Sequence, residues 1–248
     1  MKLLLLDIEN SYLVGGVWSL WNQTLSLDQL LDHGKVLCWS AKWYGKKDML
    51  FARHDDTHFL ASIHALLDEA DAVISYNGKR HDIPLLNREF LKAELAPPSP
   101  YKQIDLLETA KKAFKFPSNK LQHVSDELGI GQKLDHDGFQ MWVDCLQGDE
   151  KAWTKMRKYN MQDVKLLEKL YEKLLPWIAN HPNHNLYGHT NVCPTCGSSH
   201  VHSRGTYKTQ TGIYRKFQCQ DCGSWSRTRY TEVEKIEAKN ILTSVALT

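Results

Sequence analysis

The hydrophobic pattern of the first third of the chain is mainly that of β-strands, and the pattern of the rest is mainly that of helices. We expect strands at residues 2–8, 12–20, 35–43, 48–53 and 71–76, with a helix at 56–69 before the last of them. The spacing after residue 81 predicts helices at 83–93, 104–114, 120–128, 137–146 and 150–178. Several strands followed by several helices, with one strand after a crossover helix, predict an α/β fold with a mixed sheet flanked by helices.

The first strand, in MKLLLLDIEN, ends in two carboxylates that share a face. Alternate side chains of a strand point the same way, so Asp7 and Glu9 project together while Ile8 points into the core. Two like charges this close repel each other unless a cation or a shared proton lies between them. The stretch therefore predicts a metal site at the end of the first strand.

The four leucines before Asp7 are too short a run for a secretory leader or a membrane span, which need about 7–15 and about 20 apolar residues. We therefore expect a soluble, cytoplasmic protein that does not contact a membrane. At 248 residues, 42% hydrophobic and 24% charged, the chain has the composition of a globular protein with one full core and a small annex.

The net charge of +2 is unevenly distributed along the chain. Residues 193–230 hold six basic residues and one acidic residue, a local charge of +5, whereas residues 1–192 carry −2. An acidic body with a basic appendage predicts metal chemistry in one part and affinity for a polyanion in the other.

Four of the six cysteines stand in two C-x-x-C-G knuckles with 22 residues between them: Cys193, Cys196, Cys219 and Cys222. Four thiolates at this spacing are typical of tetrahedral zinc, and two disulfides are the alternative in an oxidising compartment. His200 and His202 could replace a cysteine, but four thiolates already complete the shell, so we expect exposed histidines. Cys38 and Cys145 lie in apolar surroundings that are typical of core thiols.

Further acids follow the fifth strand and lie on the last helix. In YNGKRHDIPLL, Asp82 is either a functional acid or an N-cap in front of a helix. In YNMQDVKLLEKL, Tyr159 and Asp163 are four residues apart and share a helical face, where singly they could be a packed aromatic and a solvated acid. Their joint occurrence with Asp7 and Glu9 favours a catalytic site.

The chain resembles the DEDD superfamily of exonucleases, in its tyrosine-bearing branch DEDDy, in three motifs that occur in the family's order: Asp7-x-Glu9, Asn77-Gly78-x-x-x-Asp82 and Tyr159-x-x-x-Asp163. YNGKRHDIPLL and the stretch from QIDLLETAKKAF to KLQHVSDELGI are also similar to the proofreading domain of family B DNA polymerases. The resemblance covers about residues 1–178. It implies a ribonuclease H-like fold and a 3′-to-5′ exonuclease that uses two Mg²⁺ or Mn²⁺ ions.

The resemblance also implies a role for each motif residue. Asp7, Glu9 and Asp163 would hold the first ion. Asp7 would also reach the second, on which Asp82 would act directly or through water, and Tyr159 would orient the attacking water. Hard oxygen ligands suit Mg²⁺ and Mn²⁺, and two such ions about 3.5–4 Å apart can activate a water and stabilise a leaving oxygen.

The sequence departs from the family pattern beside two of the expected ligands. Asn10 stands where the family often has a threonine, and His81 stands where it has an aromatic residue before Asp82. Both changes leave the expected ligands in place and affect how a terminal nucleotide would pack. His81 is a candidate substrate contact, a partner of Asp82 or a surface histidine.

We divide the chain into an exonuclease domain at 1–180, a linker at 181–190, a zinc ribbon at 191–231 and a C-terminal tail at 232–248. The ribbon, expected as two β-hairpins with a turn near 209–212, interleaves basic and aromatic residues. This mixture suits a nucleic-acid backbone and unstacked bases, although some of the aromatics are expected to form a small core. The expected substrate contacts are one residue of the first domain and seven of the ribbon: Asn77, Arg204, Lys208, Arg215, Lys216, Trp225, Arg227 and Arg229.

Together, these features predict a metal-dependent 3′-to-5′ exonuclease that hydrolyses phosphodiester bonds by a two-metal-ion mechanism. We expect DNA rather than RNA as substrate, chiefly single-stranded or frayed 3′ ends, with one structural Zn²⁺ in the ribbon. The alternatives are an RNA 3′ exonuclease, a catalytically silent nucleic-acid-binding protein and a zinc-ribbon module that recruits a protein. The sequence predicts no polymerase domain, so a proofreading role would need a replication or repair protein as partner.

Overall fold

The computed structural model describes residues 1–135, 138–188 and 190–244. They divide into two compact units, which we call the body and the ribbon unit. The body is Lys2–Leu174, and the ribbon unit runs from Leu175 toward the C-terminus and includes Met1. Among the described residues, no helix combines the length and apolar character that crossing a bilayer requires.

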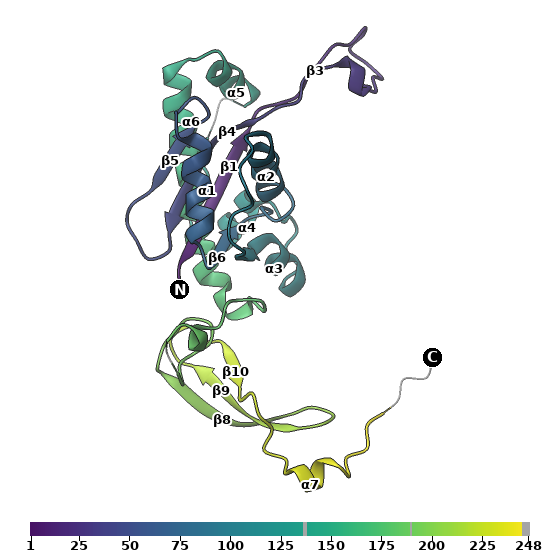
Figure 1. Ribbon diagram of the computed structural model, residues 1–248, viewed down its shortest axis with the longest axis vertical. Helices are drawn as coiled ribbons and strands as arrows, with labels where there is room; N and C mark the ends of the chain where they lie inside the picture. Colours follow the sequence, from purple (N-terminus) through teal and green to yellow (C-terminus); the bar gives the residue numbers. More distant parts are fainter. Residues whose placement is uncertain (136–137, 189, 245–248) are drawn as a thin grey trace. The chain divides into compact units, whose positions relative to one another are not determined.

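The centre of the body is a five-stranded mixed sheet with the strand order β5-β4-β1-β6-β7 (Figure 1). Strand β1 runs antiparallel to β4 and parallel to β6, β5 is antiparallel to β4, and β7 is parallel to β6. The strands are β1 (Leu3–Asn10), β4 (Val36–Trp43), β5 (Leu50–Arg53), β6 (Ala72–Ser75) and β7 (Lys102–Asp105). The predicted mixed sheet flanked by helices is thus confirmed.

Helices cover both faces of this sheet. On one face, α1 and α2 pack against Leu4, Leu6 and Ile8 of β1, and on the other α6 lies against β1 and β4. Alternation along the strand then directs Asp7 and Glu9 toward the face that α6 covers. The helices of the body are α1 (Phe59–Glu69), α2 (Asp82–Lys92), α3 (Leu106–Ala113), α4 (Leu121–Glu127), α5 (Phe139–Leu146) and α6 (Glu150–Leu174).

The strand expected at 12–20 is wrong over most of its length. Only β2 (Val14–Gly15) forms there, paired with β3 (Leu30–Asp32) after a 3₁₀ turn, η1 (Leu27–Gln29). This hairpin projects away from the sheet (Figure 1), and most of its apolar side chains are exposed, with Trp18 98% exposed. The Gly15-Gly16 pair also weakens a strand, because glycine loses the most backbone entropy on ordering.

Three helix predictions need shorter bounds. The helix expected at 56–69 begins at Phe59. The helix expected at 104–114 begins at Leu106, because residues up to Asp105 form β7 and the Asp105 carboxylate caps the helix by accepting from Leu107 N–H at 3.0 Å. The helix expected at 150–178 ends at Leu174 and continues as a 3₁₀ turn, η2 (Leu175–Trp177). The helix expected at 137–146 begins at a residue outside the described ranges.

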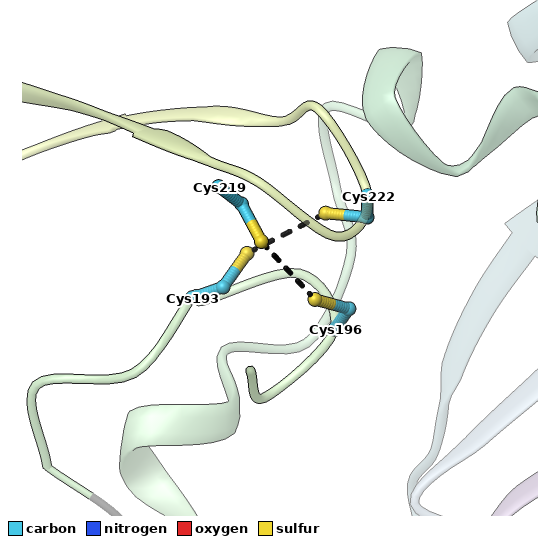
Figure 2. A group of neighbouring side chains, drawn as sticks. All are labelled: Cys193, Cys196, Cys219 and Cys222. Atoms are coloured by element: carbon cyan, nitrogen blue, oxygen red, sulfur yellow. Dashed lines mark hydrogen bonds between the residues drawn. The ribbon is translucent and has the colours of Figure 1, made fainter. Parts of the chain in front are cut away.

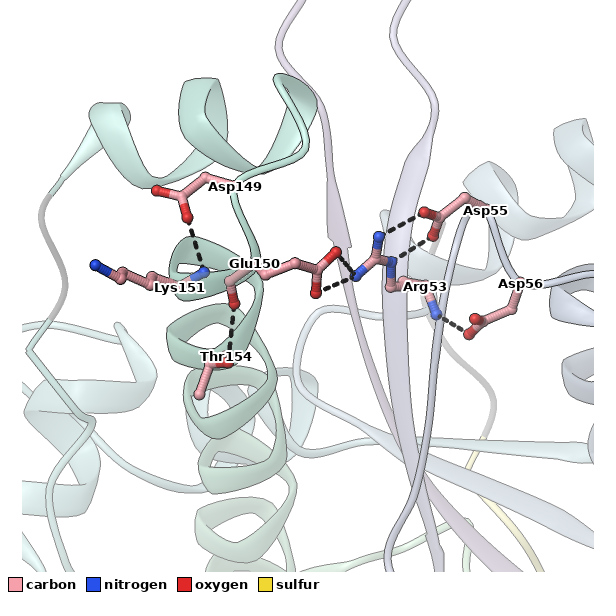
Figure 3. A network of polar contacts seen from close by, with 7 residues as sticks. All are labelled: Arg53, Asp55, Asp56, Asp149, Glu150, Lys151 and Thr154. Carbon is pink, nitrogen blue, oxygen red and sulfur yellow. Dashed lines mark hydrogen bonds and ion pairs between the residues drawn. The ribbon is translucent and has the colours of Figure 1, made fainter.

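A polar network fixes the start of α6 beside the end of β5 (Figure 3). The Arg53 guanidinium donates to both carboxylate oxygens of Asp55, at 2.5 and 2.6 Å, and to both of Glu150, at 2.9 and 3.0 Å. Glu150 lies in the first turn of α6, where the helix dipole also favours an acid. The network therefore anchors the N-terminal end of the helix that carries Tyr159 and Asp163.

The ribbon unit contains a three-stranded antiparallel sheet with the order β10-β9-β8. The first and second strands form the expected hairpin, in which Thr209 N–H donates to Gly212 O at 2.9 Å, and β9 also pairs with the third strand. Two hairpins therefore share β9. The strands are β8 (Val201–Lys208), β9 (Ile213–Cys219) and β10 (Trp225–Arg227), and the unit also contains η3 (His184–Leu186) and α7 (Lys235–Ala238).

Candidate active site and cysteine centre

Three carboxylates converge where the end of β1 meets α6. One oxygen each from Asp7, Glu9 and Asp163 lies within 4.8 Å of the others. Asp7 and Glu9 are two residues apart on the strand, and Asp163 lies on the buried side of α6, only 2% exposed. The spacing that the sequence predicted for the pair and the helical position of the third acid therefore bring them to one place.

Asp82 reaches the same region from the end of β6 but lies beside the three acids rather than among them. It is the first residue of α2, and its Oδ1 accepts a hydrogen bond from Ile8 N–H at 3.2 Å. The turn before it is tight, because a Cβ at Gly78 would lie 2.4 Å from Ser75 Oγ. Asp82 thus contacts β1 instead of capping α2, whose N-cap is His81.

A buried acid that the sequence analysis missed, Asp105, holds this turn from β7. Its carboxylate accepts from Asn77 N–H at 2.9 Å and from Lys79 N–H at 3.3 Å. Asn77 itself adopts a left-handed backbone conformation with φ of 68°. The predicted substrate contact Asn77 is therefore part of the turn that positions Asp82.

Lys133 is a second residue that the sequence analysis missed. Its ammonium group donates to Asp163 Oδ2 and, at 3.2 Å, to Tyr159 OH. Burial alone lowers the pKa of Lys133, but the Asp163 carboxylate outweighs this and raises it, so the group stays charged. Lys133 lies in the loop between α4 and α5, which has no regular pattern that could have revealed it.

Asn160, on α6, also escaped the sequence analysis. The side chain is fully buried, and its Nδ2 donates to Asp7 Oδ2 at 2.6 Å. Its Oδ1 is buried and makes no hydrogen bond to any residue in the described ranges. The position three residues before Asp163 is a signal that could have found it, because residues three apart share a helical face.

Burial and mutual repulsion change the protonation of the acids. Burial, followed by the charges of Glu9, Asp163 and Asp82, raises the pKa of Asp7 well above its ordinary value. Burial and the nearby Asp163 raise the pKa of Glu9 to about 8, and burial raises the pKa of Asp82 to about 6. The ionised forms are therefore unfavourable without a cation, as the sequence predicted for the first two.

Tyr159 lies against Lys133, whose Nζ is 5.1 Å from the ring centroid. Burial, and then the Asp163 carboxylate, raise the pKa of Tyr159, so the phenol keeps its proton at neutral pH. An open hollow of about 510 Å³ adjoins it, lined by Gln122, Gln132, Lys133, Leu134, Asp135 and Tyr159. The tyrosine is thus a hydrogen-bond donor at the wall of a space that could admit a ligand.

The two positions that depart from the family pattern contact each other. His81 is exposed, and its Nε2 lies 3.0 Å from Asn10 Oδ1. The sequence left His81 as a substrate contact, a partner of Asp82 or a surface histidine. In the structure His81 forms a hydrogen bond with Asn10, whereas the Asp82 carboxylate accepts one from Ile8 N–H.

The donor set fits a hard divalent cation. Carboxylate oxygens are the ligands that Mg²⁺ and Mn²⁺ prefer, and the buried amide oxygen of Asn160 is of the same chemical class. A cation would also relieve the repulsion that raises the pKa values of Asp7 and Glu9. The acids Asp7, Glu9 and Asp163, with Asp82 beside them, therefore suit the binding of divalent metal.

The four knuckle cysteines form a second cluster, in the ribbon unit (Figure 2). One sulfur from each of the four lies within 4.8 Å of the others, and Cys193 Sγ to Cys222 Sγ and Cys196 Sγ to Cys219 Sγ are each 3.6 Å apart. A tetrahedron with metal–sulfur bonds of about 2.3 Å has sulfur–sulfur edges of about 3.8 Å, whereas a disulfide measures about 2.05 Å. All described cysteines are free, so the cluster could form a zinc site.

At Cys219 the knuckle backbone favours the thiolate, whereas burial raises the pKa of Cys193 and of Cys196. Burial opposes ionisation, but backbone N–H groups of Cys222 and Asp221 donate to Cys219 and lower its pKa to about 7. Gly223, with φ of 78°, permits the turn that aims these amides at the sulfur. His200 and His202 lie outside the cluster and are exposed, as expected, while Cys38 and Cys145 are buried in the body.

Strand pairing assigns four of the seven predicted substrate contacts of the ribbon to one or the other face of its sheet. Strand alternation and pairing put Lys216, Trp225 and Arg227 on one face of its sheet and Arg215 on the other, where Arg215 Nε donates to Glu232 at 2.5 Å. Arg204 and Lys208 lie on β8, and Arg229 follows β10 with its guanidinium 5.5 Å from the Tyr230 ring centroid.

Comparison with known proteins gives one family and one fold. The sequence model described as the RNase_H superfamily matches residues 40–175, a range that includes Asp82, Tyr159 and Asp163 but begins after Asp7 and Glu9. Among solved structures, the family B DNA polymerase from the hyperthermophilic archaeon Pyrobaculum calidifontis matches with a TM-score of 0.55 and 17% identity, covering 71% of this chain. This protein spans 24% of the length of that polymerase chain. A search of curated proteins returned no match.

Proposed function

Because the chain belongs to the RNase_H superfamily, we propose that its body is a metal-dependent 3′-to-5′ exonuclease. The observation that carries the proposal is the approach of oxygens from Asp7, Glu9 and Asp163 to within 4.8 Å of one another, with Asp82 beside them. We propose DNA as the substrate, chiefly single-stranded or frayed 3′ ends. The fold similarity to a polymerase is a reason to test DNA first.

The side chains divide the work as follows. Asp7, Glu9 and Asp163 would hold one Mg²⁺ or Mn²⁺ ion, and Asp7 and Asp82 would serve a second. When bound, the ions supply an acidified water and positive charge for the phosphate and the leaving 3′-oxygen. Tyr159, protonated at neutral pH, donates a hydrogen bond that orients the attacking water.

Lys133 and Asn160 support this arrangement, although neither is among the metal ligands that the family resemblance implies. Lys133 binds Asp163 and Tyr159 and so fixes their spacing, and it adds a positive charge beside the hollow that adjoins Tyr159. Asn160 fixes one oxygen of Asp7. In the ribbon unit, one Zn²⁺ held by the four cysteines would stabilise a basic module that binds the same nucleic acid.

The test is digestion of oligonucleotides labelled at the 3′ or the 5′ end, as single-stranded DNA, duplex DNA and RNA, with Mg²⁺, with Mn²⁺ or with EDTA. We expect mononucleotides to be released from the 3′ end in the presence of metal. Asp7→Ala and Asp163→Asn should lower the rate by on the order of 10³-fold or more, because each removes a ligand of the metal ions that stabilise the transition state. Glu172→Gln, at an exposed acid on the same helix, is the matched control and should leave the rate unchanged.

Each other outcome selects an alternative. Cleavage of RNA alone would replace the substrate but keep the mechanism. Absence of cleavage on every substrate, with nucleic-acid binding retained, would favour a silent nucleic-acid-binding protein. Absence of both cleavage and binding would favour a ribbon that recruits a protein partner.

A further inference from the structure

One face of the ribbon sheet combines aromatic rings and positive charges. Tyr207 on β8 lies opposite Tyr214 on β9, and Lys216 on β9 lies opposite Arg227 on β10. Residues directly opposite each other in an antiparallel pair point to the same face, as do residues two apart on one strand. The side chains on this face are therefore Tyr207, Tyr214, Lys216, Gln218, Trp225 and Arg227, with His202 opposite Gln218. We call the five aromatic and charged ones, Tyr207, Tyr214, Lys216, Trp225 and Arg227, the aromatic–basic face.

The rings and the charges alternate in space. The Arg227 guanidinium lies 3.9 Å from the centroid of the Tyr214 ring, and Lys216 Nζ lies 5.5 Å from that of Trp225. Trp225 and Tyr207 remain 55% and 50% exposed. They line a hollow of about 460 Å³ together with Lys216, Ser226 and Arg227. Two half-exposed rings thus border a space whose remaining walls carry two cations.

The charges of this face are not neutralised within the ribbon. Among the described residues, no carboxylate forms an ion pair with Lys216 or Arg227, whereas Arg215 on the opposite face is paired with Glu232. The single acid of the ribbon strands and knuckles, Asp221, accepts hydrogen bonds from Ser198 and His200 instead. A ligand for the aromatic–basic face must therefore bring negative charge together with flat apolar surfaces.

We propose that the aromatic–basic face binds single-stranded nucleic acid, with neighbouring unstacked bases on Trp225 and Tyr207 and the intervening phosphate against Lys216 and Arg227. Base–aromatic stacking does not depend on sequence, because every base has a π-face. A duplex keeps its bases stacked on each other, so single strands should bind more tightly than duplexes. The proposal deepens the proposed function by naming where the strand is held, and it rests on that function only for the view that this strand is the nuclease substrate.

The experiment measures fluorescence anisotropy of a labelled 12-nucleotide DNA, single-stranded or as a duplex, with the full chain carrying Asp163→Asn and without added divalent metal. This background prevents digestion, so binding is measured whether or not the body is a nuclease. Trp225→Ala should weaken single-strand binding by about tenfold or more, as loss of a stacking platform does, and Trp225→Phe should recover most of it. Metal content per chain serves as the check that each variant ribbon is folded.

A charge-matched pair tests the face itself. Arg227→Ala and Arg215→Ala each remove one positive charge, but only Arg227 belongs to the aromatic–basic face. Arg227→Ala should weaken binding severalfold and lower the slope of log K against log salt by about one, whereas Arg215→Ala, whose charge is already paired with Glu232, should have a clearly smaller effect on both. Equal effects of the two variants would overturn the proposal in favour of diffuse electrostatic attraction. Unchanged binding by Trp225→Ala, or tighter binding of the duplex, would also overturn it, and either result would leave the nuclease assay unaffected.

Discussion

Buried apolar side chains pack on both faces of the sheet in the body, from Leu4 to Tyr171. In the described residues 190–244, by contrast, the buried apolar side chains are those of Cys193 and Cys219. Below about 40 residues a chain usually cannot bury enough apolar surface to fold without a metal or disulfides. The body therefore has a core of its own, which its buried acids weaken, whereas in the ribbon a metal held by the cysteine cluster would take the place of a core.

The largest expected effect follows from the second half of this comparison. Cys219→Ser should remove the ribbon metal and unfold residues 191–231, because binding of structural zinc contributes on the order of 10 kcal/mol to such folds. Hydrogen exchange read by mass spectrometry should show lost protection in the ribbon and unchanged protection in the body. Cys145→Ser, at a cysteine outside the cluster, should retain one metal ion per chain. If the ribbon stayed protected from exchange without metal, the view that a metal replaces its hydrophobic core would be wrong.

Asn160→Ala tests whether the buried amide prepares the acid site for metal. Loss of its hydrogen bond to Asp7 should raise the Mg²⁺ concentration for half-maximal cleavage by about 10–100-fold, with a smaller loss of rate at saturating metal. Gln162→Ala, which changes an amide on the same helix that contacts Gln132 O, is the control. An unchanged metal requirement would show that Asn160 only packs against Asp7.

The acids should make the metal-free body less stable as pH rises. The pKa of Glu9 is about 8 in the folded protein against an ordinary 4.5, so the folded state binds more protons than the unfolded state between these values. The free energy of unfolding of the metal-free body is therefore highest, as far as Glu9 is concerned, below about pH 4.5, and it falls as the pH rises through 8 and Glu9 ionises. Glu9→Gln should remove this loss. At pH 8.5 it should raise the free energy of unfolding by on the order of 1–2 kcal/mol, and hence the melting temperature by about a few degrees.

The control for this measurement is the addition of metal. Mg²⁺ or Mn²⁺ should stabilise the wild-type body more at pH 8.5 than at pH 5, because binding requires ionised carboxylates. A melting temperature for the Glu9→Gln protein that changes with pH as the wild type does would contradict the assignment of the effect to this residue.

The smallest expected effect concerns the exposed pair beside the acids. His81→Ala should lower kcat/KM by about two- to tenfold, the range for loss of one hydrogen bond. If His81 acts through Asn10, then Asn10→Ala should cause a similar loss and the double variant no further loss. Additive losses would instead indicate that His81 contacts the substrate by itself.

Local periodicity predicted the parts of the acid site that depend on one element at a time. Strand alternation put Asp7 and Glu9 together, and helical spacing put Tyr159 and Asp163 on one face. Lys133 could not be predicted this way, because it reaches Asp163 from an irregular loop 30 residues away in the sequence.

Burial explains the errors in the predicted elements. Residues 12–20 have apolar side chains typical of a strand, but in the structure most of these side chains are exposed on a hairpin away from the sheet. Residues 102–105 show the opposite error, because no strand was predicted there and one forms. Strand β7 is only four residues long and gains its strand conformation by pairing with β6. In both cases the outcome depended on partners distant in sequence, which a local pattern does not contain.

The alternation along β1 has a genetic consequence. Loss or gain of one codon among those for Leu3 to Leu6 would exchange the two faces of the strand, turning the leucines of one layer toward the other and both carboxylates toward α1 and α2. Loss or gain of two codons would preserve the faces and change only the length of the strand. Natural variants of this segment should therefore differ in length by even numbers of residues.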